Sequence, residues 1–350
     1  MSAECGMWNA ESTPGLRFRI PHSALRILLA FGVACSAPPP PRSVPITIPP
    51  GATLDAAIES LSAHGVLRRP TLFRWYASLR GLRSSLKTGE YRFSPDAAWS
   101  DIVATLEGGR GVEVRWTVRE GLMLGEVAEL AAAQIGIPRD SMLAAAGDPA
   151  LRHELGLPPA ATSVEGYLFP TTYVVPVHIT ARDLVRVMTR EFLARWQPEW
   201  TPRLDSLHMT RQQLVTLASI IEAEVRYDPD RPFISAVYRN RLARGMRLEA
   251  DPTVIYAYGR RLKRVWEKNL AVRSQYNTYL HPGLPPGPIC QPGSASLVAA
   301  LDPAPVPFLY FVAQPDGKHI FSVTYAEHQA AIRAVKRMRT ESRGRRPPGR

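Results

Sequence analysis

Cysteine is scarce in this sequence, and its scarcity excludes two common ways of holding a chain together. The 350 residues include only Cys5, Cys35 and Cys290. Two of these lie in or before an N-terminal apolar run, so a disulfide framework in the folded region is excluded. No CxxC pair and no close grouping of cysteine with histidine occurs, which excludes a structural zinc site of the usual ligand spacing.

A hydrophobic run of membrane-spanning length is also missing. The longest mostly apolar stretch extends from Ala24 to Ala37, fourteen residues, whereas a spanning helix needs about 20. Arg17, Arg19 and Arg26 precede the apolar centre of this stretch, and a proline-rich segment follows it. This pattern is typical of an export signal, and the upstream positive charge predicts that the rest of the chain lies outside the cytoplasm.

The fate of this segment stays open at the level of sequence. Three interpretations place it in or at a membrane: a retained anchor, a cleaved signal peptide, or a lipoprotein signal. The last follows from Gly32–Cys35, a degenerate cleavage site with Cys35 as the lipid-bearing residue. The alternative is a buried helix of a cytosolic domain.

Motifs of a nucleic-acid-binding fold are absent, although the formal net charge is +12. Between Ala331 and Arg350 there are eight Arg or Lys residues and one Glu, a net charge of +7 and over half of the total. This tail lacks aromatic residues and periodicity, so we predict that it is disordered. A basic tail binds anionic lipids or polymers without specificity, and no specific nucleic-acid partner is expected.

Periodic apolar residues indicate a small α+β unit at residues 46–111. A helix is predicted where Leu54 and Leu61 share one face, and Gly65 ends it. "TGEYRF" alternates like a strand, and a second helix is predicted around Ile102 before Gly108 and Gly109. The unit contains no cluster of ionisable residues, so we expect a binding or spacing module.

A second unit begins near Val112 and repeats the order strand, turn, helix. This repetition of the first unit, called the internal echo below, is weak, and in it Gly121 corresponds to Gly51. Helices are predicted from about 181 to 259, and Asp316-Gly317 predicts a hairpin turn. The fold class is therefore α+β, with four segments: residues 1–45 (tip, apolar segment and linker), 46–111 (first unit), 112–335 (second unit) and 336–350 (basic disordered tail).

The segment "TRQQLVTLASIIEAEV" predicts a helix that carries a carboxyl group on an apolar face. Thr210 and Gln213 form a capping box, so the helix begins at about Arg211. Glu222 shares a face with Val215, Ala218 and Ser219. Burial on such a face favours the neutral carboxyl group, which a general acid requires. The alternative interpretation is a buried Glu222 paired with an arginine, Arg239 or Arg241. Glu224 is expected to face solvent or to support the residues around the site.

Other constrained segments supply candidate substrate-binding residues. "VEGYLFPTTY" is interpreted as a sugar-stacking wall or a turn lining the core, and Asp251 before Pro252 also resembles a helix N-cap. His319 is interpreted as structural. The candidates are Glu165, Tyr167, Asp251, Tyr276, Asn277, Thr278 and Tyr279.

Five segments, in this order along the chain, resemble the endolytic murein transglycosylases of the MltG or YceG-like family, and the resemblance covers about Ile46 to the early 330s. They are "EGYLFPTTY", "LASIIEAEV", "LEADPTVIYAYG", "YNTYLHPGLPPGPICQPGSASLVAALDP" and "FLYFVAQPDGKHIFSVTYAEH". The resemblance implies an inner-membrane anchor, a LysM-like α/β subdomain and a periplasmic catalytic domain with Glu222 as the catalytic residue. It also implies peptidoglycan glycan strands as substrate, cell-wall synthases as partners, and no metal or organic cofactor.

The implied reaction is cleavage of the β-1,4 bond between N-acetylmuramic acid and N-acetylglucosamine, with 1,6-anhydro ends, which terminates nascent strands. A hydrolase would need two carboxyl groups, and the sequence offers one convincing candidate. A muramidase-type hydrolase, with Asp251 or Glu249 as second carboxylate, stays open. So does a non-catalytic wall-binding or division scaffold.

Overall fold

The computed structural model describes residues 43–344 except 50, 110, 178 and 263. The predicted export segment and the last six residues of the basic tail lie outside the described residues. Within the described part, buried side chains form two separate hydrophobic clusters. One cluster draws on residues 46–106 and the other on residues 116–301, so each predicted unit has its own core.

The first unit is built on a two-stranded antiparallel sheet, β1 with β2, in which Ile46 faces Tyr91. The predicted helices and strands are confirmed, but two helices between Gly65 and Gly89 were not predicted. That segment carries exposed as well as buried apolar residues, which obscures the periodicity. The elements are β1 Val44–Ile48, α1 Leu54–Ala63, α2 Pro70–Leu79, α3 Leu82–Ser85, β2 Gly89–Phe93 and α4 Trp99–Gly108.

The second unit opens on the same plan as the first. Gly51 and Gly121 adopt positive φ angles of +78° and +74°, and Leu54 and Leu124 are the first residues of α1 and α5. The internal echo is therefore confirmed. Here β3 Glu113–Thr117 pairs antiparallel with β4 Thr172–Pro176.

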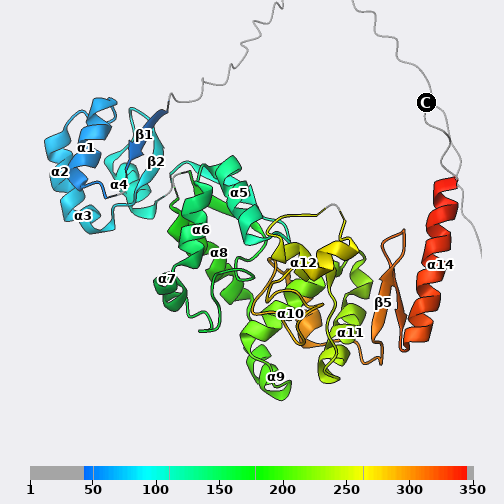
Figure 1. The fold of residues 1–350 in the computed structure, drawn as a ribbon. Coiled ribbons are helices and arrows are strands. Elements are labelled where there is room, and N and C mark those ends of the chain that lie inside the picture. Colours follow the sequence, from blue (N-terminus) through cyan, green and yellow to red (C-terminus); the bar gives the residue numbers. More distant parts are fainter. Residues whose placement is uncertain (1–42, 50, 110, 178, 263, 345–350) are drawn as a thin grey trace, which may run out of the picture. The chain divides into compact units, whose positions relative to one another are not determined.

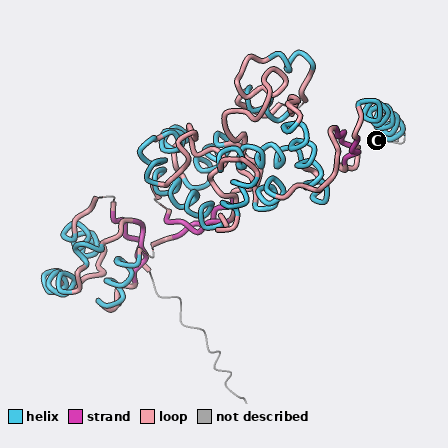
Figure 2. Tube along the Cα trace, turned by 90° about the horizontal axis from the view of Figure 1, so that it is seen from below, coloured by secondary structure: helices cyan, strands magenta, loops and turns pink. Residues whose placement is uncertain are grey.

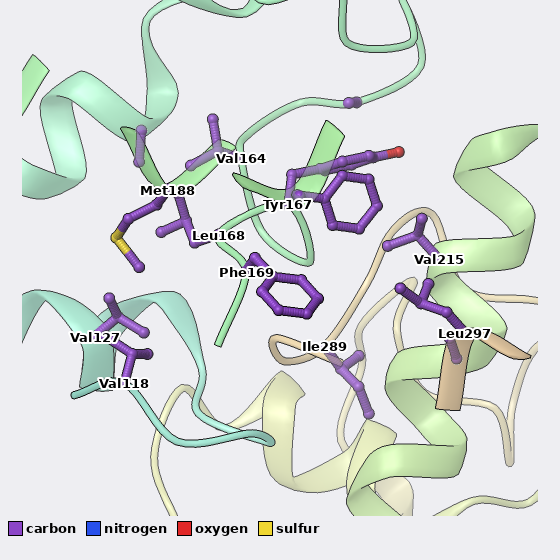
Figure 3. Packing of buried hydrophobic residues seen from close by; sticks show 14 of the residues in the cluster. Val118, Val127, Val164, Tyr167, Leu168, Phe169, Met188, Val215, Ile289 and Leu297 are labelled. Carbon is purple, nitrogen blue, oxygen red and sulfur yellow. The ribbon is translucent and has the colours of Figure 1, made fainter. Parts of the chain in front are cut away.

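Helices dominate the rest of the second unit, as Figure 2 shows. Helix α10 packs against α9, α11, α12 and α13, and Tyr167, Phe169, Val215 and Ile289 gather in the core beside it (Figure 3). The helices are α5 Leu124–Ile135, α6 Arg139–Gly147, α7 Pro149–Glu154, α8 Ala181–Arg195, α9 Trp200–Ser206, α10 Arg211–Glu224, α11 Arg231–Ala243, α12 Asp251–Ala257 and α13 Ser294–Leu301, with short 3₁₀ turns η1 Asp228–Asp230 and η2 Glu267–Ala271.

The C-terminal part consists of a hairpin and a long helix. Strands β5 Tyr310–Ala313 and β6 His319–Ser322 pair antiparallel around the predicted Asp316-Gly317 turn. Helix α14, Tyr325–Gly344, packs against both strands. The prediction of disorder from residue 336 is therefore wrong as far as Gly344. Ala331 and Val335, one turn apart, are buried, and this apolar face stabilises a helix that continues into the basic segment.

No helix in the described part of the chain is both long and apolar enough to span a bilayer. The predicted anchor, the signal peptide and the lipid site at Cys35 all fall on residues outside that part.

Candidate functional site

Helix α10 begins where the capping box predicts. The Thr210 hydroxyl accepts a hydrogen bond from the Gln213 main-chain N–H over 3.2 Å, and the Gln213 side chain accepts from the Thr210 N–H over 2.8 Å. The helix is not amphipathic, however, because consecutive residues from Leu214 to Ile221 are all buried. A helix that is apolar all round lies inside the fold, so the end of α10 brings Glu222 to the edge of the core.

Glu222 is held by a main-chain amide and a guanidinium. Its side chain is 8% exposed, and Arg231 Nη1 lies 3.2 Å from Oε2. The main-chain N–H of Gly293 donates to the same oxygen over 3.0 Å. Arg231 also pairs with Asp228 at 2.7 Å and donates to the Ser296 hydroxyl. Both contacts hold the Glu222 carboxyl group in place.

The arginine beside Glu222 differs from the two that the sequence suggested. Arg239 contacts the sulfur of Met209, and Arg241 donates to the Leu309 carbonyl and pairs with Glu249 at 3.1 Å. Both belong to α11 but lie on turns remote from its first residue, Arg231. Sequence spacing could not identify the partner, because the packing of α11 on α10 selects it.

The loop that supplies Gly293 is tied to α10 by Ser219. The Ser219 hydroxyl accepts from the Ile289 N–H over 3.0 Å, and the Cys290 thiol donates to the Ser219 carbonyl over 3.2 Å. Burial raises the pKa of Cys290 well above its usual value, so this thiol is a neutral donor. Ser219, which the sequence placed on the Glu222 face, therefore positions the loop.

A second carboxyl group, Glu120, lies beside Glu222, and sequence reasoning missed it. Glu120 occupies the turn between β3 and α5, and its Oε1 is 1.8 Å from the point where a Cβ on Gly293 would stand. Burial and then the charge of Glu222 raise the pKa of Glu120, while Arg231 lowers it. The internal echo could have pointed to Glu120. In the first unit a proline precedes the turn glycine, whereas in the second unit Glu120 occupies that position.

Glu165 and Tyr167 point into the protein. Glu165 accepts from the Leu124 N–H over 3.0 Å at the start of α5 and from the Gln291 side chain. Burial raises the pKa of Glu165 to about 8. Tyr167 is fully buried and donates to Gln212 over 2.7 Å. These two candidates hold the walls of the site together.

The loop of residues 276–279 buries two of its four side chains and leaves two partly exposed. Asn277 is buried and donates to two main-chain carbonyls, and the buried Thr278 hydroxyl bonds that of Thr253 over 2.9 Å. Tyr276 packs against Tyr256, with ring centroids 4.7 Å apart. Tyr279 donates to Asp251 over 2.8 Å.

Asp251 and Tyr279 line a cavity of about 700 Å³, to which α10 contributes Ala223 and Glu224 but not Glu222. Asp251 is the first residue of α12 rather than its N-cap, which is Ala250. Glu224 lines the same cavity instead of facing open solvent. It accepts from Tyr238 over 2.9 Å, and burial raises the pKa of Glu224 to about 7. A cavity of this volume is within the usual range for small ligands.

The described residues contain no group of three or more His, Cys, Asp or Glu that could hold a metal ion. His319 bonds Asp230 through its ring and its main-chain N–H, in keeping with a structural role. The arrangement around Glu222 can donate and accept a proton.

The chain matches known proteins over most of its length. The YceG-like family matches residues 46–334. An endolytic murein transglycosylase of Bacillus subtilis is 32% identical over 306 residues, covering 83% of this chain and 84% of that protein. One from Streptococcus pneumoniae is 25% identical and is matched over 58% of its own length.

A solved structure has a similar fold. The crystal structure of a putative yceG-like protein from Listeria monocytogenes aligns with a TM-score of 0.58 and 31% identity. The alignment covers 82% of this chain and 98% of the Listeria protein. With the family match spanning most of the residues that fold into both units, the chain belongs to the YceG-like family.

Proposed function

We propose that the protein is a lytic transglycosylase that cuts peptidoglycan glycan strands internally, with Glu222 as its catalytic residue. The observation that carries the proposal is the largely buried carboxyl group of Glu222, held by Gly293 and Arg231. The relatives named endolytic murein transglycosylase support the same substrate and reaction.

In this mechanism Glu222 acts twice. Its carboxyl group protonates the oxygen that bridges N-acetylmuramic acid and N-acetylglucosamine, and the bond from that oxygen to C1 breaks. The resulting carboxylate then takes the proton of the muramyl C6 hydroxyl while O6 bonds to C1 and closes the 1,6-anhydro ring. The attack is intramolecular, so its entropy cost is already met, and the carboxyl group returns to its starting state.

The cavity lined by Ala223 and Glu224, the two residues that follow Glu222 on α10, is the proposed binding groove for the sugars on one side of the scissile bond. Asp251 and Tyr279 line it and supply the polar groups that hydroxyls and N-acetyl groups require. Tyr276 packs at the base of the same loop. Glu165, Tyr167, Asn277 and Thr278 would act through the loops whose shape they maintain.

The first unit is proposed as a LysM-like module that grips glycan. Helix α2 exposes Leu72, Trp75 and Leu79, with exposed fractions of 52%, 70% and 82%. These residues share one face by helical spacing, and an exposed apolar patch marks an interaction site. The same proposal includes retention at the inner membrane through the N-terminal segment, with the catalytic domain in the periplasm. It also includes control by cell-wall synthases. Together these would place the enzyme where it can terminate nascent strands.

Product analysis tests the reaction. Mass spectrometry of strands digested by the full chain should show 1,6-anhydro-muramyl ends. Reducing ends instead would make the enzyme a muramidase-type hydrolase and sink the proposed chemistry. The absence of any soluble product, with retained binding to sacculi, would favour the non-catalytic scaffold.

A further inference from the structure

The carboxyl groups of Glu120 and Glu222 both lie next to Gly293. The N–H of Gly293 donates to Glu222 over 3.0 Å, and the Glu120 carboxyl group fills the space that a side chain on Gly293 would need. Glu222 Cγ lies 3.9 Å from the point where a Cβ on Gly121 would stand. The turn at Gly121 and the loop at Gly293 thus bring two carboxyl groups from distant parts of the chain close enough for the charge of Glu222 to act on Glu120.

Main-chain hydrogen bonds hold the Glu120 turn in this place. The Gly121 N–H donates to the Gln291 carbonyl over 2.8 Å, and the Gln291 N–H donates to the Leu122 carbonyl over 2.9 Å. Arg261 donates to the Gly121 carbonyl over 2.6 Å. The turn cannot move away from Gly293 without breaking these bonds, so the proximity of Glu120 is built into the fold.

The Glu120 carboxyl group itself has no hydrogen-bond partner among the residues that the structure describes. Unlike Glu222, it is exposed to solvent. No hydrogen bond of the described fold therefore depends on Glu120, and its role at the site is electrostatic.

The position of Glu120 allows its charge to oppose the effect of Arg231 on the protonation of Glu222. A guanidinium next to a carboxyl group favours the ionised form, yet the first step of the reaction requires Glu222 to carry a proton. A second negative charge opposes the effect of the guanidinium, and two adjacent carboxyl groups lose their protons in coupled steps. Glu120 supplies that charge.

We propose that Glu120 is a positioning residue whose negative charge keeps the catalytic proton at Glu222 in the working enzyme. The proposal rests on the function proposed above. It does not require Glu120 to touch substrate, and no atom is transferred to it in the net reaction.

The other charged groups at the site do not replace Glu120. The groups that act on Glu120 electrostatically are Glu222 from α10, Asp228 from η1 and Arg231 from α11. Asp228 is bound to Arg231 at 2.7 Å, which offsets its charge. Arg261 contacts the Gly121 carbonyl but pairs with Glu126 at 2.8 Å, which offsets its charge, and the facing loop adds the neutral thiol of Cys290.

The test is the pH dependence of kcat/KM on purified sacculi for the full chain, Glu120→Gln and Glu120→Asp. Removing the negative charge of Glu120 removes its repulsion of a charge on Glu222, so the alkaline limb of the Glu120→Gln profile should move to lower pH. Glu120→Asp keeps the charge and should restore most of the limb. Glu113→Gln, an exposed carboxyl group on β3, should match the wild type.

Each result decides the proposal. A structural role would lower the rate by the same factor at every pH, so an unmoved limb in Glu120→Gln overturns it. Should Glu120→Gln be too slow to titrate, Glu120→Asp decides: recovered activity supports the charge, and an equally inactive Asp variant refutes it. If the wild type releases no anhydro product, the proposed function fails first, whatever Glu120 does.

Discussion

The main-chain N–H of Gly293 donates a 3.0 Å hydrogen bond to Glu222, across 71 positions of sequence. The bond joins the loop before α13 to the end of α10. The Glu120 carboxyl group occupies the space where a side chain on Gly293 would begin. The site is therefore assembled by three segments that meet only in the folded chain.

Glu222→Gln should abolish glycan cleavage and leave the fold intact. The amide can neither donate an acidic proton nor take one back, and general acid–base catalysis contributes about 10² to 10⁴-fold. Arg231 keeps Asp228 as a partner at 2.7 Å, so the variant should remain folded. Release of soluble muropeptides from sacculi measures the loss, with the exposed Glu199→Gln as control. Cleavage within tenfold of wild type would remove Glu222 from its assigned role.

Gly166→Ala should destabilise the protein far more than Gly259→Ala. Both glycines have positive φ, +82° and +65°, which costs an L-residue about 1–2 kcal/mol. A Cβ at Gly166 would also stand 2.5 Å from Pro288 and 2.9 Å from Val215, whereas nothing lies within 4 Å at Gly259. Urea unfolding of both variants measures the difference, and equal midpoints would show that the Gly166 contact relaxes freely.

The stability difference between wild type and Glu165→Gln should depend on pH. Burial raises the pKa of Glu165 to about 8 in the folded protein, so between about pH 4.5 and 8 the folded state binds the proton that the unfolded state has released. Stability therefore falls as pH rises through this window, by up to about 1.4 kcal/mol per pH unit. The isosteric amide removes this slope.

Unfolding in urea at pH 5, 6.5 and 8 measures that dependence. Glu224 is present in both proteins, so its own titration cancels in the difference. Relative to wild type, Glu165→Gln should gain stability toward pH 8. Parallel curves for the two proteins would mean that Glu165 is ionised in the folded state.

Trp75→Ala should weaken binding to sacculi without changing the reaction. Trp75 is 70% exposed on α2, and no buried contact of the first unit depends on it. Cosedimentation with sacculi measures binding, and the proportion of anhydro ends measures the chemistry. Trp266→Ala, which changes a tryptophan of the second unit at 54% exposure, is the control. Unchanged cosedimentation of Trp75→Ala would show that the glycan-binding surface lies elsewhere.

Local features of the chain were predicted well because their causes are local. The capping box of Thr210 and Gln213, the hairpin turn at Gly317 and the paired turns at Gly51 and Gly121 depend on residues a few positions apart. The same holds for the helix periodicity of both units. The α14 extension escaped prediction because its buried face is set by β5 and β6.

The sequence by itself determined the α+β units, the start of α10 and the presence of Glu222 on it, since propensity, capping and spacing act between near neighbours. Only the tertiary structure decided that Arg231, rather than Arg239 or Arg241, pairs with Glu222. It also decided that Glu120 stands beside Glu222, while Asp251 and Glu249 line the neighbouring cavity. These choices depend on which loops pack together across long separations, and no short-range pattern encodes such packing.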